Sequence, residues 1–556
     1  MTLLETPVPV ARPNTDGIAE RATKLTTVLV ALLAAAPILV YLWVALHRVG
    51  YPYELDWMEG GSVELAGRVL NGHSLYSAPS IAYVGWTYPP LYYWLTAAMA
   101  KVIGLGFLPL RLVSLAASLV AMGTLGWMVT RESGNRVAGL VAAGLFAATF
   151  RISGAWFDTG RVDSLFLALT LIALATGRHA RGVRGGIGLG VIAFLAFFTK
   201  QTAVIALAPA LVYLVLVRRR VGISAALTLV ALIAVSTAVL QAATGGWYGY
   251  YIYGELIHQQ VAQTLWLGFW RDDIWQQQWP LVIFVIGGAA TLALRTRTLA
   301  RRTGKAPVLH ALYYATAAAG LIGSAWVSRL HTGGYANVLM PAYAAIALLA
   351  GLTSAALASN GGSAPAGNGG GGSAPAGNGG SAPAGNGGSA PAGNGGALAS
   401  KRGAALAGGL GAVAVTAQLA LLIYPIDKQI PTPADRTAGA QLIARLRSLP
   451  GPVLVLRHPW YATEAGKGTF AHEEAIGDVL RSTAKRGAGP LARSLRSALD
   501  AYHVRAVVLD GGFDAHLLEP ELAREFRLQS APVTPSRLYP LTDVRSSPTL
   551  LYLRRR

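Results

Sequence analysis

Acidic and basic side chains gather in four short polar segments that separate long apolar runs of the 556-residue sequence. The first segment contains Asp56 and Glu59, which are three residues apart and would share one face of a helix. The later segments supply further candidates: Asp158, Arg161, Asp163, Lys200, Arg329 and His331. Ionisable residues at membrane depth are costly and usually functional, so these residues are the first hypothesis for a site.

This combination of residue types suits the transfer of a group from a lipid-linked phosphate. A carboxylate takes the proton of an acceptor hydroxyl as general base. Arginine and lysine neutralise the charge that develops on the departing phosphate, arginine through a bidentate fork and lysine as a point charge. The sequence contains no G-x-x-x-x-G-K-[ST] motif and no glycine-rich phosphate loop after a strand, which argues against nucleotide hydrolysis.

Each candidate also has a structural interpretation. Carboxylates are ordinary loop residues, a lysine can extend to the lipid headgroups, and an interfacial histidine needs no ligand. Asp158 and Asp163 can pair with Arg161 to satisfy a helix end. A metal site built from the first acidic segment and His331 lacks the spacing of known metal ligands. We therefore predict no metal ligand and leave a divalent cation open as a cofactor.

The composition places these segments in a membrane protein. Hydrophobic residues make up 53% of the chain and charged residues only 13%, and the mean hydropathy is +0.45. Soluble domains average about 25% charged residues. The absence of cysteine excludes disulfides, thiolate metal sites and a cysteine nucleophile. The net charge of +20 comes from short arginine clusters between apolar runs, which are typical of topology signals and not of a nucleic-acid surface.

Eleven apolar runs are predicted to be transmembrane helices: 26–46, 109–130, 137–157, 162–177, 185–199, 202–217, 222–243, 280–294, 308–328, 336–357 and 403–424. The arginine clusters between them all face the cytoplasm only if the segment 47–108 stays on the outer side. The apolar stretch Leu91–Leu105 within that segment is therefore predicted to lie along the membrane interface. We expect an all-α polytopic protein of a bacterial inner membrane.

The predicted organisation has five parts: a cytoplasmic N-terminus (1–25), a transmembrane catalytic domain (26–357, with 47–108 as its first outer loop), a cytoplasmic linker (358–402), a last transmembrane helix (403–424) and an extracytoplasmic domain (425–556). The linker repeats Ser-Ala-Pro-Ala-Gly-Asn four times among glycines and cannot bury a core. The last part alternates strand-like stretches with helical ones such as Thr437–Ser448, which indicates a small α/β domain.

Several segments resemble the GT-C superfamily of membrane glycosyltransferases. They are Asp56–Tyr76, the segment Tyr88–Leu95 with its Pro-Pro-Leu sequence, Leu110–Ser114, Arg161-Val-Asp163 and Phe198-Thr-Lys200. The likeness covers about 25–355 and is to the branch that contains the protein O-mannosyltransferases and the lipid A aminoarabinose transferase. In that branch an acidic motif opens the first outer loop and an arginine begins the second span.

The resemblance implies that Asp56 or Glu59 activates the acceptor, although the family usually has an adjacent acidic pair; we prefer Asp56. It also implies a polyprenyl-phosphate sugar donor and inversion at the anomeric carbon. We therefore predict an inverting glycosyltransferase that acts on a glycan, lipid or protein acceptor outside the membrane. Asp158 and Asp163 are assigned to the sugar or the acceptor. The candidate cations for the lipid phosphate are Arg111, Arg161, Lys200, Arg329 and His331.

Two other functions fit parts of the sequence. A transporter or flippase of lipid-linked sugars would carry ionisable residues midway along helices and broken segments in two symmetric halves, a repeat that the sequence does not show. A non-catalytic assembly or sensor protein would bind its ligand through 425–556 alone and leave Asp56 dispensable. The sequence does not specify the sugar, the acceptor, the prenyl length or the oligomeric state.

Overall fold

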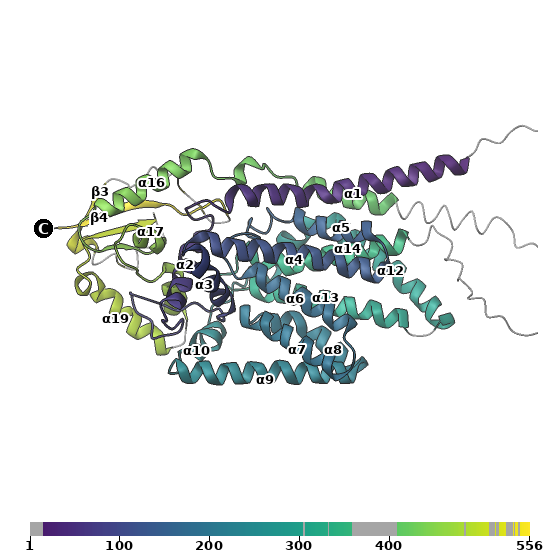
Figure 1. Ribbon diagram of the computed structural model, residues 1–556, viewed down its shortest axis with the longest axis horizontal. Helices are drawn as coiled ribbons and strands as arrows, with labels where there is room; N and C mark the ends of the chain where they lie inside the picture. Colours follow the sequence, from purple (N-terminus) through teal and green to yellow (C-terminus); the bar gives the residue numbers. More distant parts are fainter. Residues whose placement is uncertain are drawn as a thin grey trace, which may run out of the picture.

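The computed structural model describes residues 15–303, 306–331, 333–358, 409–482, 485–510, 518, 522–529, 538, 540–542 and 545–555. A long bundle of helices makes up most of the molecule, and a smaller domain from the last part of the chain lies at one end of it (Figure 1). The predicted linker, apart from residue 358, lies outside the described residues, as do residues 1–14 of the predicted cytoplasmic N-terminus.

A helix lies at the position of each predicted span. In chain order these helices are α1 (Thr15–Arg48), α4 (Phe107–Ser133), α5 (Arg136–Ala148), α6 (Asp163–His179), α7 (Gly182–Thr199), α8 (Ala203–Val217), α9 (Arg219–Ala243), α12 (Gln276–Thr303), α13 (Ala306–Arg329), α14 (Met340–Ala358) and the helix Gly409–Leu421. Among the described residues, six helices are long and apolar enough to cross a membrane: Lys24–Arg48, Phe107–Ser133, Gly182–Thr199, Arg219–Ala243, Val308–Arg329 and Ala336–Ala358. The predicted all-α polytopic membrane fold is confirmed.

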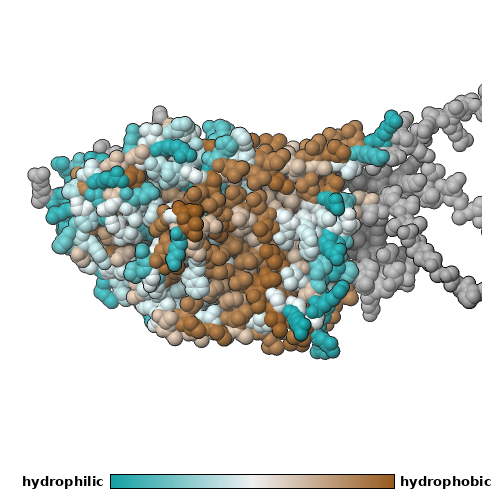
Figure 2. Space-filling model, viewed as in Figure 1, coloured by the Kyte–Doolittle hydropathy of each residue, from teal (hydrophilic) through white to brown (hydrophobic). Residues whose placement is uncertain are grey.

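The surface of the bundle is suited to lipid. Figure 2 shows a broad apolar band across the visible face of the bundle, with polar surfaces at both of its ends. Leu216 in α8 and Leu227 in α9 are 74% and 66% exposed, although both are large and apolar. A soluble monomer rarely exposes a continuous surface of this kind.

Two short helices follow α1 and lie at the end of the bundle next to the C-terminal domain (Figure 1). They are α2 (Glu59–Leu70) and α3 (Leu91–Ile103), which pack against each other and against α4. The 13 residues of α3 make a helix of about 20 Å, too short for a hydrocarbon core of ~30 Å. Val102 near its end is 83% exposed. These features suit a helix that lies along the membrane interface.

Irregular helical turns connect the later spans. They are α10 (Trp247–Gly249), the π-helix η1 (Tyr250–Glu255), α11 (Leu265–Gly268), the π-helix η2 (Phe269–Trp275) and the 3-10 helices η3 (Ala336–Leu339) and η5 (Asp427–Gln429). π-helical turns are rare and often accompany functional sites. The residues Leu256 and Gln259, which follow η1, line the cavity described below.

The C-terminal domain is a small α/β domain, as predicted. Its elements are α16 (Pro433–Ser448), β1 (Val453–Val455), α17 (Pro459–Glu464), α18 (Glu473–Arg481), α19 (Lys485–Ala501), β2 (Ala506–Asp510), β3 (Phe526–Gln529) and β4 (Pro548–Arg554). The sheet has the order β1-β2-β4-β3, with β1 parallel to β2 and the other two pairs antiparallel. A capping box between Thr432 and Asp435 fixes the start of α16.

One apolar core joins this domain to the segment between α1 and α4. Trp57 and Tyr92 from that segment belong to the same buried cluster as Ile476 of α18 and Val507 of β2. A separate buried cluster fills the helix bundle. Because burial of large apolar side chains stabilises by about 1.5–3 kcal/mol each, the shared core fixes the C-terminal domain on the loop that contains Asp56.

Candidate active site

A cavity lies where the helix bundle meets the C-terminal domain, and we call it the interdomain cavity. Its space is about 830 Å³, including its opening to solvent. The bundle side contributes Arg161, Lys200 and His331, which are three of the predicted site residues. Other residues that line it include Trp86, Tyr88, Tyr335, Glu474 and Asp478. Sites of this kind combine apolar and aromatic walls with a few convergent polar groups.

Asp56 does not line the cavity itself but contacts Arg161, which does. The Asp56 carboxylate is fully buried, and its Oδ2 lies 3.5 Å from Nη1 of Arg161. The Arg161 guanidinium lies over the rings of Trp156 and Trp86, 4.9 and 5.4 Å from their centroids. The ion pair is long compared with the others at this end of the bundle. Arg161 is therefore held mainly by aromatic stacking and only loosely by the carboxylate.

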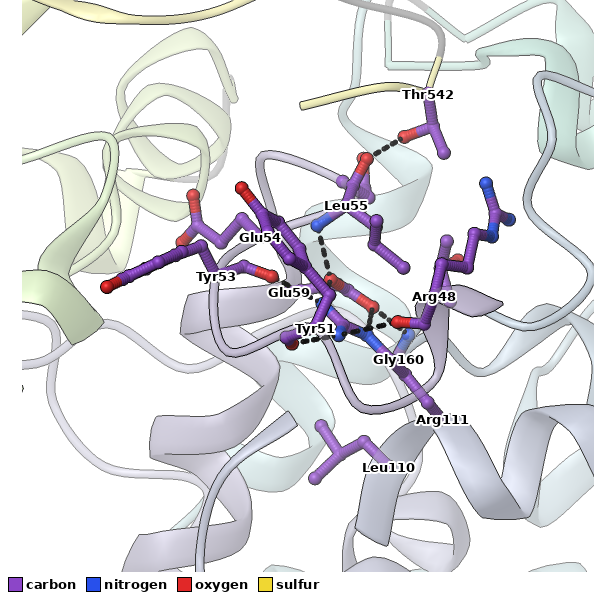
Figure 3. Close-up of polar contacts among 12 residues, drawn as sticks. Arg48, Tyr51, Tyr53, Glu54, Leu55, Glu59, Leu110, Arg111, Gly160 and Thr542 are labelled. Carbon is purple, nitrogen blue, oxygen red and sulfur yellow. Dashed lines mark hydrogen bonds and ion pairs between the residues drawn. The ribbon is translucent and has the colours of Figure 1, made fainter. Parts of the chain in front are cut away.

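Glu59 has a different environment, in which it accepts four hydrogen bonds. Arg111 donates from Nε to Oε1 at 3.0 Å and from Nη2 to Oε2 at 2.6 Å (Figure 3). The backbone N–H groups of Gly160 and Leu55 donate at 2.6 and 2.8 Å. Burial alone would raise the pKa of Glu59, but Arg111 and these N–H groups hold it below its usual range. Glu59 is thus an ionised anchor for the loop, with its acceptor capacity in use.

Lys200 and Asp163 form a buried pair at the edge of the interdomain cavity. Nζ of Lys200 lies 2.7 Å from Oδ1 of Asp163. Lys200 lines the cavity, and both residues line a smaller adjoining pocket. Lys200 therefore does not extend to the headgroups, the structural interpretation open to it from sequence.

Asp158 and Arg329 do not line the interdomain cavity, and each has another partner. Arg48 at the end of α1 donates from Nε to Oδ2 of Asp158 at 2.8 Å, with both side chains fully buried. Arg329 donates from Nε to Oδ2 of Asp273 at 2.8 Å. Asp158 thus joins α1 to the loop before α6, whereas the sequence suggested Arg161 as its structural partner. Their assignment to the substrate therefore stays a prediction.

His331 lines the interdomain cavity as an uncharged base. Burial lowers the pKa of His331, and the nearby Lys200 ammonium lowers it further. Among the described residues, no group of three or more His, Cys, Asp or Glu side chains is arranged to hold a metal ion. Asp56, Glu59 and His331, which the sequence offered as a metal site, do not form such a group.

Sequence reasoning missed a buried cluster that locks the C-terminal domain to the acidic loop. Nδ1 of His458 contacts Glu54 Oε2, and Nε2 of His458 lies 3.1 Å from Asp510 Oδ2. Ser546 donates from Oγ to the same Asp510 oxygen. The Thr542 hydroxyl donates to the Leu55 carbonyl at 2.8 Å (Figure 3). Glu54 and His458 are 404 residues apart, so no local pattern could have joined them.

This lock predicts a pH-dependent stability. Burial alone would lower the pKa of His458, but the carboxylates of Asp510 and Glu54 raise it to about 10. A raised histidine pKa contributes stability that is complete below the unfolded value near 6.5 and is lost as pH rises through 10. We expect the melting temperature to fall between pH 6.5 and 10, and His458→Gln to flatten that part of the curve. An unchanged slope in His458→Gln would contradict this assignment.

The comparisons with known proteins agree with the fold. Residues 87–241 match the family described as dolichyl-phosphate-mannose-protein mannosyltransferase. The structure of ArnT from Cupriavidus metallidurans bound to undecaprenyl phosphate aligns with a TM-score of 0.52 at 14% identity, over 95% of this chain and 98% of that chain. The apo structure of the same protein aligns with a TM-score of 0.50 at 15% identity, over the same shares. No curated protein sequence matches the chain. The predicted resemblance to this branch of the GT-C superfamily is confirmed.

Proposed function

We propose that the chain transfers a sugar from a polyprenyl-phosphate donor to an acceptor outside the membrane. The observation that carries the proposal is the interdomain cavity, which Arg161 and Lys200 both line and where Arg161 contacts the buried carboxylate of Asp56. The GT-C fold and the match to a mannosyltransferase family support a membrane glycosyltransferase. The solved ArnT structure of this fold is described as bound to undecaprenyl phosphate, which supports a lipid phosphate as the donor's leaving group.

In the proposed reaction Asp56 takes the proton of the acceptor hydroxyl. The hydroxyl oxygen then bonds to the anomeric carbon as the bond between that carbon and the phosphate oxygen breaks. The polyprenyl phosphate leaves with the bonding electrons, and Arg161 and Lys200 neutralise its charge. A single displacement of this kind inverts the anomeric carbon. Glu59 keeps the loop in place through Arg111 and takes no proton.

The loose pair between Arg161 and Asp56 suits an exchange of partners. A donor phosphate in the cavity offers Arg161 two oxygens in the geometry of its fork, which a contact at 3.5 Å to one carboxylate oxygen does not match. When Arg161 turns to the phosphate, the Asp56 carboxylate loses the contact with this cation and becomes a stronger base. Donor binding would thereby prepare Asp56 for the acceptor proton.

The charged groups around the cavity also discriminate against a transporter. A transporter would hold its ionisable residues midway along the helices. Here Arg48 lies at the end of α1, Arg111 in the first turns of α4, Asp163 at the start of α6 and Lys200 just after α7. Lys200 shares the interdomain cavity with α18, Asp163 pairs with Lys200, Arg111 pairs with Glu59, and Arg48 contacts the Gln429 carbonyl, so these charges lie near the C-terminal part of the chain.

Sugar transfer from a defined polyprenyl-phosphate donor by the purified protein tests the proposal. We expect the double variant Lys200→Gln/Asp163→Asn, which leaves no unpaired buried charge, to bind the donor roughly 10- to 100-fold more weakly, since a hydrogen bond to a charged group contributes about 1.5–3 kcal/mol. The matched control is Lys428→Gln/Asp427→Asn, an exposed pair with its charges 3.9 Å apart. Equal donor binding by the two double variants would contradict the role of Lys200.

A further inference from the structure

The interdomain cavity has walls of opposite charge. The bundle supplies the cations Arg161 and Lys200, whereas α18 of the C-terminal domain supplies the carboxylates of Glu474 and Asp478. These two acids are one helical turn apart and therefore lie on the same face of α18. The adjacent Glu473 instead pairs with Arg457 at 2.9 Å. Of the two acids in the first turn of α18, only Glu474 therefore lines the cavity.

Arg481 fixes the two acids of this wall without filling their capacity to accept hydrogen bonds. Its Nη2 donates to Glu474 Oε1 at 3.2 Å and to Asp478 Oδ1 at 2.9 Å. A carboxylate can accept about four hydrogen bonds, so each retains room for a ligand. Among the described residues, Oε2 of Glu255 in the neighbouring turn η1 is buried and has no hydrogen-bond partner. Burial and the nearby Asp478 carboxylate raise the pKa of Glu255 to about 9, so that it is a neutral donor at pH 7.

Aromatic side chains also line the interdomain cavity. Trp86, Tyr88 and Tyr335 line the cavity together with the charged groups. Flat apolar surfaces with a few convergent polar groups are what a pocket for a polar ring requires. A sugar phosphate matches this arrangement, because its phosphate is the charged end and its ring hydroxyls extend away from that end.

We propose that Glu474 and Asp478 form the wall that recognises the transferred sugar and selects a neutral polyhydroxylated ring. The inference rests on the proposed function, because it takes the donor phosphate to lie at Arg161 and Lys200. The sugar hydroxyls then donate to the two carboxylates. A uronic acid would be repelled mainly by Glu474, because burial and the neighbouring Glu474 raise the pKa of Asp478 to about 7. An ammonium group on the ring would meet the Arg481 guanidinium, which already donates to both carboxylates and offsets part of their negative charge.

The experiment compares Glu474→Gln and Asp478→Asn with the wild-type protein and with Asp500→Asn, an exposed control in the same domain whose side chain is 67% exposed. Three polyprenyl-phosphate donors are used, which carry a neutral hexose, a hexuronic acid or an amino sugar. We expect the wild-type protein to prefer the neutral donor. We expect each α18 variant to raise the KM for that donor roughly 10- to 100-fold, the loss of a charge-assisted hydrogen bond.

A second measurement separates recognition of the sugar from folding and from the proposed function. Binding of sugar-free polyprenyl phosphate should be unchanged in Glu474→Gln and Asp478→Asn. If both variants transfer sugar at the wild-type rate with an unchanged KM, this inference is wrong while the proposed function stands. The same conclusion follows if the wild-type protein prefers the uronic or the amino donor. Absence of transfer from all three donors, with no binding of polyprenyl phosphate, would overturn the proposed function itself.

Discussion

Asp56→Asn is expected to lower the rate of sugar transfer by about 10²–10⁴, the usual effect of removing a general base. The amide keeps the shape of the side chain and can still accept a hydrogen bond from Arg161, but it cannot take the acceptor proton. The stacking of Arg161 on Trp156 and Trp86 does not depend on the carboxylate. Asp56 and Arg161 are both buried, so the variant should lose some stability, but the folded protein should keep donor binding and the loss of transfer should appear in kcat.

The measurement is turnover with a defined polyprenyl-phosphate donor, with donor binding followed separately. Asp272→Asn is the control, because its carboxylate is 42% exposed and pairs with the neighbouring Arg271. Near-normal turnover in Asp56→Asn would refute the mechanism, and the transporter interpretation would then gain weight. Ligand binding by the C-terminal domain together with a dispensable Asp56 would favour the assembly or sensor function.

The fold was predictable from sequence because its signals are local. Each apolar run of α1, α4 or α9 identifies its own helix, and the arginines at the helix ends need no knowledge of distant partners. The strand-like pattern at 504–510 likewise identifies β2, whose five residues are all buried. The spacing of apolar residues in a helix or strand indicates which of its positions are buried, and it can be read without knowledge of tertiary contacts.

The pairing of the site residues was not predictable, because it depends on contacts between distant segments. Asp158 pairs with Arg48, 110 residues earlier, and not with the neighbouring Arg161. Asp56 and Glu59 are equivalent as letters in one motif, yet one contacts Arg161 loosely and the other is enclosed by four donors. Glu474 and Asp478 of α18 line a cavity together with residues of the bundle, and no local sequence pattern indicates this contact between distant segments.

Glu59→Gln separates the two acids that the sequence left as alternative bases. Glu59 and Arg111 are both fully buried, so the amide would leave the Arg111 charge without a counter-ion. Breaking a buried pair by removing one partner costs about 3–5 kcal/mol, and the amide nitrogen would also face groups that donate to Glu59 now. We expect Glu59→Gln to unfold at a clearly lower temperature and to lose activity through that loss of structure.

Two further variants turn this expectation into a decisive comparison. Glu132→Gln breaks a pair with Arg178 whose side chains are 17–18% exposed, and it should cost less than Glu59→Gln because water can reach both groups. Glu59→Leu/Arg111→Met removes both buried charges but leaves the Gly160 and Leu55 N–H groups without their acceptor, so it should recover only part of the stability. Thermal unfolding of the purified variants measures these differences. If Glu59→Gln keeps wild-type stability and donor binding but transfers no sugar, Glu59 and not Asp56 is the base.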